Sequence, residues 1–262
     1  MGHVRGVNGR TASVTGVGHA MGRRFGSTMF YETVIFDAAG TLVGRDSPDF
    51  FEEFFVVAAG ELEAEITLDQ VKAVLSKAME EPRFGKRDGR MSTPEQTRRY
   101  FVDLYAHVFS AVGIEGDLQS GLQQYYDRFQ DGRYLDVYDD VRPTLKRLKD
   151  RGVRLGVLSN WSEHLSQVLK RHDLDRYFSF LVVSAEAGCE KPNERIFRMA
   201  IDRAEAPVDR ILYIGDYPEE DILPAERVGL DALLIDRYEK YGRYRLPSIR
   251  QLTDVPGLLG IT

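Results

Sequence analysis

Cysteine is nearly absent from this chain of 262 residues. The single cysteine, Cys189, excludes an internal disulfide framework and a zinc site built from several cysteines. No stretch approaches the roughly 20 consecutive apolar residues that a membrane-spanning helix needs. Positive charge is also scarce, because 41 Asp and Glu residues outnumber 35 Lys and Arg residues. The net charge of -6 argues against a nucleic-acid partner, which usually requires a basic surface.

The rest of the composition is that of an ordinary globular protein. Hydrophobic residues make up 43% of the chain and charged residues 29%. The length suits one large domain or a core with an insertion. We therefore expect a cytoplasmic protein with no membrane partner, present as a monomer or a homodimer.

Residues 1–28 differ from everything that follows them. They contain seven glycines, four arginines and no acidic residue. A secretory signal needs an apolar stretch of about 7–15 residues, and none is present here. This composition is typical of a flexible tail ahead of a core that begins near Met29.

Five short apolar segments, rich in β-branched residues, predict strands that are buried on both faces. They are Thr33–Phe36, Arg154–Leu158, Leu181–Ser184, Ile211–Ile214 and Ala232–Ile235. Helical segments are expected near Glu163–His172, Asn193–Ala204 and Glu220–Val228, and over about 140–149. Repeated strand–helix units of this length predict an α/β fold with a Rossmann-like parallel sheet and helices on both faces.

The gap between the first two strands is too long for a single crossover helix. Residues 45–135 read as mostly helical, with helix starts at Ser47-Pro48, at Thr67 and at Thr93-Pro94. We predict that this segment is an inserted α-helical cap domain. The α/β core would then consist of residues 29–44 and 136–262.

Polar residues follow four of the predicted strands at the point where each strand ends. In open parallel sheets, ligands bind beyond the carboxyl ends of the strands. A single Ser-Asn, Lys-Pro or Gly-Asp pair is usually a helix cap or a turn. Asp37 and these three pairs, which follow four strands in this order, predict a common crevice instead. The residues are Asp37, Ser159, Asn160, Lys191, Asp216 and Asp221.

Four short motifs resemble those of the haloacid dehalogenase (HAD)-like hydrolase superfamily. They are "FDAAGTL", "LSN", "EKP" and "GDYPEED", spread over roughly residues 30–236. The helical insertion after the first strand is similar to the C1-type cap of subfamily IA. This resemblance implies Mg²⁺-dependent hydrolysis of a small phosphorylated or other anionic metabolite.

The resemblance also implies a role for each matching residue. Asp37 would be the nucleophile that forms an aspartyl-phosphate, and Lys191 would neutralise charge on it and on the phosphoryl group. Thr41, Ser159, Asn160 and Lys191 would bind the phosphoryl group. The metal ligands would be Asp37, Asp216 and the backbone carbonyl of Ala39, and Asp221 would either bind the metal directly or support the direct ligands. These roles agree with the preference of Mg²⁺ for oxygen ligands and with the need of phosphoryl transfer for charge neutralisation.

Ala39 departs from the phosphatase pattern, which has Asp at this position. That Asp protonates the leaving group, and general acid–base catalysis is worth about 10²–10⁴-fold. One alternative is therefore a protein that binds phosphate and Mg²⁺ without efficient turnover. Dehalogenation of 2-haloacids is disfavoured by Asp216, because the dehalogenases need no metal. A phosphonatase-like reaction would require a desolvated cap lysine, for which Lys72, Lys77 and Lys86 are candidates.

Two basic segments allow more than one interpretation. The loop "EPRFGKRDGR" carries Arg83, Lys86, Arg87 and Arg90, and it either lies in solvent or reaches over the crevice to an anionic leaving group. The segment "DRYEKYGRYR", residues 236–245, alternates aromatic and basic residues. Because the whole chain is acidic, we expect it to be a packed C-terminal extension rather than an RNA-binding element.

Overall fold

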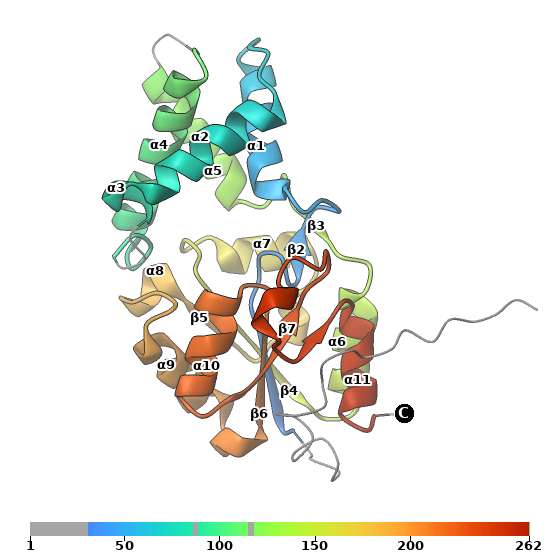
Figure 1. Ribbon diagram of the computed structural model, residues 1–262. Helices are drawn as coiled ribbons and strands as arrows, with labels where there is room; N and C mark the ends of the chain where they lie inside the picture. The colour runs from blue at the N-terminus through green and yellow to red at the C-terminus, as the bar shows by residue number, and fades with distance from the viewer. Residues whose placement is uncertain (1–30, 86–88, 115–117, 262) are drawn as a thin grey trace, which may run out of the picture.

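A six-stranded parallel sheet lies at the centre of the α/β core, below the helical insertion in the view of Figure 1. The computed structural model describes residues 31–85, 89–114 and 118–261. The strand order is β5 (Phe180–Val183), β4 (Arg154–Ser159), β1 (Thr33–Phe36), β6 (Ile211–Gly215), β7 (Asp231–Ile235) and β8 (Ser248–Ile249). All five predicted strands are present, and the α/β prediction is confirmed. The two-residue β8 was not predicted, because so short a segment cannot show the periodic pattern of side chains from which a strand is predicted. The predicted tail, residues 1–28, lies outside the described residues.

The two faces of the sheet are covered by different helices. α6 (Val141–Asp150), α7 (Leu165–Arg171) and α11 (Val255–Leu258) pack on one face, and α9 (Glu194–Ala204) and α10 (Leu223–Arg227) pack on the other. Alternate residues of β1 face the two layers, since Val34 and Phe36 join the first cluster and Ile35 joins the second. This burial on both faces explains why the strand segments are almost entirely apolar.

Short helical turns connect these elements. They are η2 (Asp175–Tyr177), α8 (Ser184–Ala187), η3 (Val208–Arg210), η4 (Pro218–Ile222), η5 (Gly242–Tyr244) and η6 (Leu252–Asp254). The helix predicted near Glu220–Val228 is present, but it begins at Pro218 with the π-helical turn η4 and continues as α10. Such wide turns occur frequently at functional sites.

In the part of the chain that the structure describes, the insertion after β1 contains five helices (Figure 1). They are α1 (Phe50–Glu61), α2 (Leu68–Glu80), α3 (Pro82–Gly85), α4 (Pro94–Ala111) and α5 (Leu118–Gln130). Thr67 forms the predicted capping box with Gln70, and Thr93 caps α4 ahead of Pro94. α1 begins at Phe50, two residues later than the Ser47-Pro48 pair suggested. The insertion has its own hydrophobic cluster, rich in aromatic side chains such as Phe55 and Tyr105.

A two-stranded antiparallel sheet lies where the chain leaves and re-enters the core. β2 (Val43–Gly44) pairs with β3 (Asp136–Val137). We propose that the boundaries of the cap follow β2 and precede β3, with a cap of residues 45–135 and a core of residues 29–44 and 136–262. Of the helices in the described ranges, none combines the length and apolar character needed to cross a membrane.

Candidate active site

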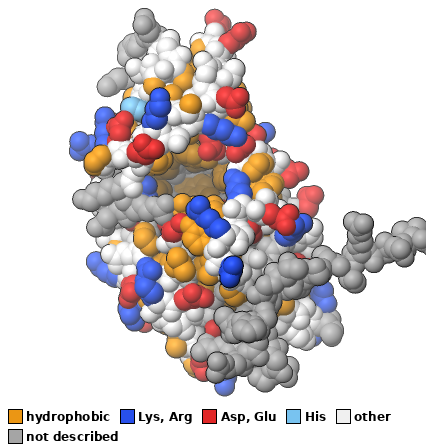
Figure 2. All heavy atoms as spheres, viewed as in Figure 1, with side chains coloured by type: hydrophobic (Ala, Val, Ile, Leu, Met, Phe, Trp, Pro, Cys, Tyr) orange, Lys and Arg blue, Asp and Glu red, His pale blue; other side chains and the backbone are white. Residues whose placement is uncertain are grey.

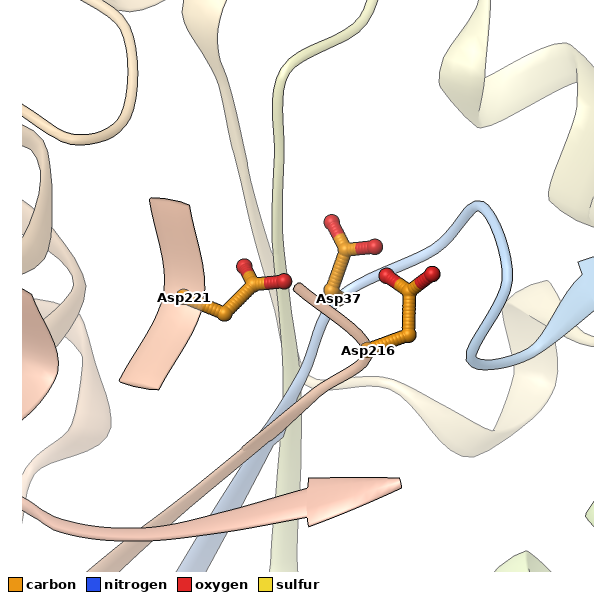
Figure 3. A group of neighbouring side chains, drawn as sticks. All are labelled: Asp37, Asp216 and Asp221. Atoms are coloured by element: carbon orange, nitrogen blue, oxygen red, sulfur yellow. The ribbon is translucent and has the colours of Figure 1, made fainter. Parts of the chain in front are cut away.

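Three carboxyl groups converge at the carboxyl edge of the sheet (Figure 3). Asp37 directly follows β1, Asp216 directly follows β6, and Asp221 lies in the π-helical turn η4. One carboxylate oxygen from each lies within 4.8 Å of the other two. Asp37 and Asp221 are buried, and Asp216 is half-buried. The sequence prediction that these residues meet in one crevice is therefore correct in its geometry.

The loop after β1 turns tightly enough to leave Asp37 at the sheet edge. The amide of Asp37 donates to the carbonyl of Ile214 at 2.8 Å, which continues the pairing of β1 with β6. The amides of Leu42 and Val43 both donate to the carbonyl of Ala38, at 2.8 and 3.0 Å. Gly40 has a φ of +74°, a conformation that glycine adopts without the cost a side chain would impose.

Asp216 lies against this loop. A Cβ atom added to Gly40 would stand 2.1 Å from Oδ2 of Asp216. The glycine is therefore required twice at this position, for its backbone conformation and for the space that the carboxyl group of Asp216 fills. The loop and Asp216 hold one another in place through this contact.

Lys191 supplies the positive charge of the site. Its Nζ donates to Oδ1 of Asp37 at 2.6 Å and to Oδ1 of Asp221 at 2.5 Å. Asn160 fixes the backbone of Lys191, because its Oδ1 accepts from the lysine amide at 2.7 Å and its Nδ2 donates to the lysine carbonyl at 2.9 Å. The side chain of Lys191 is only 4% exposed, so the ion pairs are shielded from solvent.

Asp221 is held by two further donors. The hydroxyl of Tyr213 donates to Oδ1 of Asp221 at 2.7 Å, and the amide of Tyr217 donates to Oδ2 at 3.0 Å. Tyr213 lies in the middle of β6 and was not identified from the sequence. The available signal was a tyrosine in an otherwise apolar strand, since a buried tyrosine hydroxyl usually finds a hydrogen-bond partner.

The crowding of carboxyl groups shifts their protonation equilibria. Burial raises the pKa of Asp37 to about 6 even though Lys191 lowers it, and Asp221 adds to the increase. Burial and the charges of Asp37 and Asp221 raise the pKa of Asp216 well above its usual range. For Lys191, burial would lower the pKa, but Asp221 and Asp37 outweigh it and raise the pKa. One ammonium group thus faces three carboxyl groups, which leaves an excess of negative charge when all are ionised.

Two hydroxyl groups complete the predicted phosphoryl-binding set. Ser159 is the last residue of β4 and is buried. Thr41 is fully buried, and its Oγ1 has no hydrogen-bond partner among the described residues. An unpaired buried hydroxyl is costly, so its presence commonly points to a missing ligand or water. Ala39 is half-buried in the same loop.

A segment of the insertion contacts the core next to Lys191. Glu190, which is 1% exposed, accepts from the amides of Arg90 and Met91 and from the hydroxyl of Ser92. The guanidinium of Arg90 also lies 3.5 Å from Glu190 and from Glu220. Of the basic loop, Arg90 therefore lies at the junction with the core, whereas Lys86 and Arg87 fall outside the described residues.

A hollow separates the insertion from the core (Figure 2). Hydrophobic side chains line it, and charged side chains surround its rim. A pocket that is open to solvent adjoins Asp216 and Gly40, with Tyr138, Arg237 and Tyr241 among its other lining residues. The segment 236–245 was expected to pack as a C-terminal extension. Arg237, Tyr238 and Tyr241 of this segment line the pocket, whereas Arg243 and Arg245 are exposed. Its contribution to the site was not foreseen.

Sequence comparison identifies the protein family. The sequence model of the family described as "haloacid dehalogenase-like hydrolase" matches residues 31–229. The chain belongs to this family. The resemblance of the four motifs is thereby confirmed, as is the prediction of a hydrolase.

Individual relatives of this HAD-like hydrolase match over shorter stretches. The haloacid dehalogenase-like hydrolase domain-containing protein 3 of Xenopus laevis is 30% identical over 156 residues, 59% of this chain and 62% of that protein. The glyceraldehyde 3-phosphate phosphatase of Methanopyrus kandleri is 36% identical over 124 residues, 47% of this chain and 52% of that protein. The matched part spans less than two thirds of each of these two relatives.

A solved structure shares the whole described architecture. YfnB from Bacillus subtilis, described as a HAD-hydrolase bound to magnesium, superimposes with a TM-score of 0.69. The alignment covers 88% of this chain and 100% of YfnB, at 21% sequence identity. At this identity the likeness shows the fold alone.

The acidic cluster of this HAD-like hydrolase has the chemistry of a site for a hard divalent cation. Its donors are carboxylate oxygens, which suit Mg²⁺. The excess negative charge is what a bound cation would compensate; after burial, which is the larger cause, the neighbouring carboxylates also raise the pKa values of Asp37 and Asp216. No cysteine or histidine belongs to the described cluster, so the donor set does not favour a softer metal.

The cap lysines do not meet the requirement for Schiff-base chemistry. Lys72 donates to Asp49 at 2.6 Å, and its side chain is 40% exposed. Lys77 is exposed on α2. Neither described lysine is desolvated, as a nucleophilic amine would have to be. The third candidate, Lys86, lies outside the described residues.

Proposed function

We propose that this protein is a Mg²⁺-dependent phosphatase of small phosphorylated metabolites that works through an aspartyl-phosphate at Asp37. One observation carries the proposal: the ammonium of Lys191 lies 2.6 Å from Oδ1 of Asp37 in a buried site that also contains Asp216 and Asp221. A carboxylate nucleophile paired with a cation, beside a set of metal-type ligands, suits phosphoryl transfer better than direct attack by water.

The proposed reaction has two steps. An oxygen of the Asp37 carboxylate attacks phosphorus, the bond from phosphorus to the leaving-group oxygen breaks, and the leaving group departs with its electron pair. Water then attacks phosphorus, which releases phosphate and regenerates the carboxylate. Lys191 neutralises charge on Asp37 and on the transferring group, and the hydroxyls of Thr41 and Ser159, with Asn160, bind the phosphoryl oxygens.

The proposed metal ligands are Asp37, Asp216 and the backbone carbonyl of Ala39. Both oxygens of Asp221 already accept hydrogen bonds from protein donors. We therefore propose that Asp221 supports the metal site from its edge while it positions Lys191. When bound, Mg²⁺ would neutralise charge on the phosphoryl oxygens.

Ala39 restricts the substrates that such a site can turn over. It has no acidic group to protonate a departing alkoxide, so ordinary phosphomonoesters should react slowly. Substrates whose leaving group needs little protonation, such as acyl phosphates or aryl phosphates, should react fastest. The relative from Methanopyrus kandleri is named as a glyceraldehyde 3-phosphate phosphatase, and this phosphomonoester belongs in the substrate screen as a member with a poor leaving group.

A binding protein with little turnover is the second candidate, and the observation that favours it is the same Ala39. The test compares multiple turnover of p-nitrophenyl phosphate and of acetyl phosphate, each with Mg²⁺ and with a chelator. Metal-dependent release of many equivalents of phosphate supports the phosphatase. Saturable Mg²⁺ and phosphate binding with less than one turnover would support the binding protein instead.

A further inference from the structure

Arg237 reaches from the C-terminal part of the core to the loop that follows the nucleophile. It lies two residues after β7 and eight residues beyond the segment that matches the family. Its Nε donates to the carbonyl of Gly40 at 3.3 Å, and its Nη2 donates to the carbonyl of Thr41 at 2.8 Å. The side chain thus bonds two consecutive carbonyls of the loop that holds Asp37 and Ala39.

The guanidinium itself is fixed from two other sides. It makes a two-pronged contact with Asp140, at 2.8 Å from Nη1 and 3.1 Å from Nη2. It also stacks over the ring of Tyr138, 4.0 Å from the ring centroid. Asp140 in turn accepts from the amide of Leu252 at 2.7 Å. The side chain of Arg237 is only 11% exposed and that of Asp140 only 10%, so solvent weakens this ion pair little. The two-pronged contact also gives the guanidinium a defined orientation.

The loop that Arg237 holds carries two features of the proposed metal site. The carbonyl of Ala39 belongs to it, and Gly40 lies against the carboxyl group of Asp216. Its amides bond within the loop, as Gly40 donates to the carbonyl of Val43 at 2.8 Å. The carbonyls of Gly40 and Thr41 instead point outward to Arg237. A displacement of the loop would therefore move the Ala39 carbonyl and open the contact with Asp216 together.

We propose that Arg237 is a positioning residue, which holds the loop of residues 39–42 in the geometry that the metal site needs. The part of this inference that concerns Mg²⁺ affinity rests on the proposed function. The part that concerns the order of the loop is independent of it. Lysine could not replace the arginine fully, because one ammonium group cannot match a planar fork that bonds two carbonyls and a carboxylate together.

Arg154 provides a matched control at the other end of the sheet. Its guanidinium bonds a carbonyl, that of Arg203 at 3.4 Å, and a carboxylate, that of Glu205 at 2.9 Å. It also lies 5.6 Å from the ring centroid of Phe180. Arg154→Ala therefore removes the same kinds of contact at the start of β4, away from the carboxyl edge where the acidic cluster lies.

The experiment compares wild type, Arg237→Ala, Arg237→Lys and Arg154→Ala, well below the melting temperature of each. Hydrogen exchange at the amides of residues 40–43 is measured in metal-free protein, and the dissociation constant for Mg²⁺ is measured by calorimetry. We expect faster exchange at these amides and an affinity for Mg²⁺ lower by about 10–100-fold in Arg237→Ala, the scale typical of residues that orient metal ligands. Arg237→Lys should be intermediate, and Arg154→Ala should match wild type in both exchange and Mg²⁺ affinity, even where its melting temperature is lower.

The result that would overturn the inference is a purely structural effect. In that case Arg237→Lys would have unchanged exchange at residues 40–43 and unchanged Mg²⁺ affinity, with only a lower melting temperature like that of Arg154→Ala. Arg237 would then stabilise the fold without positioning the loop of the site. If Arg237→Ala does not fold, Arg237→Lys alone decides the question. Should wild type bind no Mg²⁺, the proposed function fails, whereas faster loop exchange in the Arg237 variants would still support the positioning role.

Discussion

The ammonium group of Lys191 lies 2.6 Å from Oδ1 of Asp37, although 154 residues separate them in the chain. The same ammonium lies 2.5 Å from Asp221, so two carboxylates share one buried cation. This arrangement keeps Asp37 next to positive charge before any substrate arrives. It also makes the stability of the site depend on Lys191.

Replacing Lys191 by methionine should destabilise the metal-free protein. The change leaves three carboxyl groups without a counter-charge, and breaking a buried ion pair typically costs about 3–5 kcal/mol. Urea unfolding in chelator measures the loss, and phosphatase activity should fall with it. Lys170→Met, on the exposed face of α7, serves as the control. Addition of Mg²⁺ should restore more stability in Lys191→Met than it adds to wild type; an equal gain in both would argue against a metal among these carboxylates.

Asp216→Ala should abolish both the activity and its dependence on Mg²⁺. Magnesium should raise the melting temperature of wild type, because it binds the native state and not the unfolded chain. The variant should show no such rise, whereas the exposed control Asp209→Ala should behave as wild type. If chelator changes neither activity nor melting in wild type, the metal assignment is wrong. Chloride release from 2-chloropropionate would then become the next assay.

Ala39→Asp should supply the missing acid–base group. Because Ala39 is half-buried, a larger side chain at this position has room to extend away from the loop. Hydrolysis of sugar phosphates, whose departure needs a proton, should rise by about 10²-fold or more. The gain with p-nitrophenyl phosphate should be smaller. Ala39→Asn, which has the same shape and no acid, should give neither. No gain on any phosphomonoester, in a folded variant that still binds Mg²⁺, would contradict the explanation.

Thr41→Val separates a binding role from a structural one. The hydroxyl of Thr41 is buried without a partner among the described residues, so its replacement by a methyl group should leave the melting temperature unchanged or raise it. If the hydroxyl binds the phosphoryl group, KM should nevertheless rise severalfold. Thr41→Ser should retain wild-type KM. A variant with unaltered KM would remove Thr41 from the phosphoryl-binding set.

The sequence located the site because parallel strands place their carboxyl ends at one edge. β1 begins and ends at the predicted residues, because its apolar run stops at Asp37 and thereby indicates the end of the strand. The meeting of Lys191 with Asp37 followed from the same rule. No sequence pattern, in contrast, indicates the direction of a long side chain, so the contact of Arg237 with Gly40 and Thr41 could not be foreseen.

Two other features that the sequence did not predict also depend on contacts that form only in the folded structure. Tyr213 looked like one more core residue, because its hydroxyl finds a partner only in the folded structure. The helix expected over Glu220–Val228 follows helical spacing, but its first part forms the π-helical turn that brings Asp221 to Lys191. Tertiary contacts at the site therefore override local preference.

The most direct test of the account is to trap the phosphorylated enzyme. Wild type and Asp37→Asn are mixed with labelled acetyl phosphate and Mg²⁺, quenched in acid, and analysed by peptide mass spectrometry. The account predicts a hydroxylamine-sensitive acyl phosphate on the peptide that contains Asp37, absent from Asp37→Asn, which should fold normally and release no phosphate. Undiminished turnover in Asp37→Asn, with no phosphate on Asp37 in wild type, would contradict it.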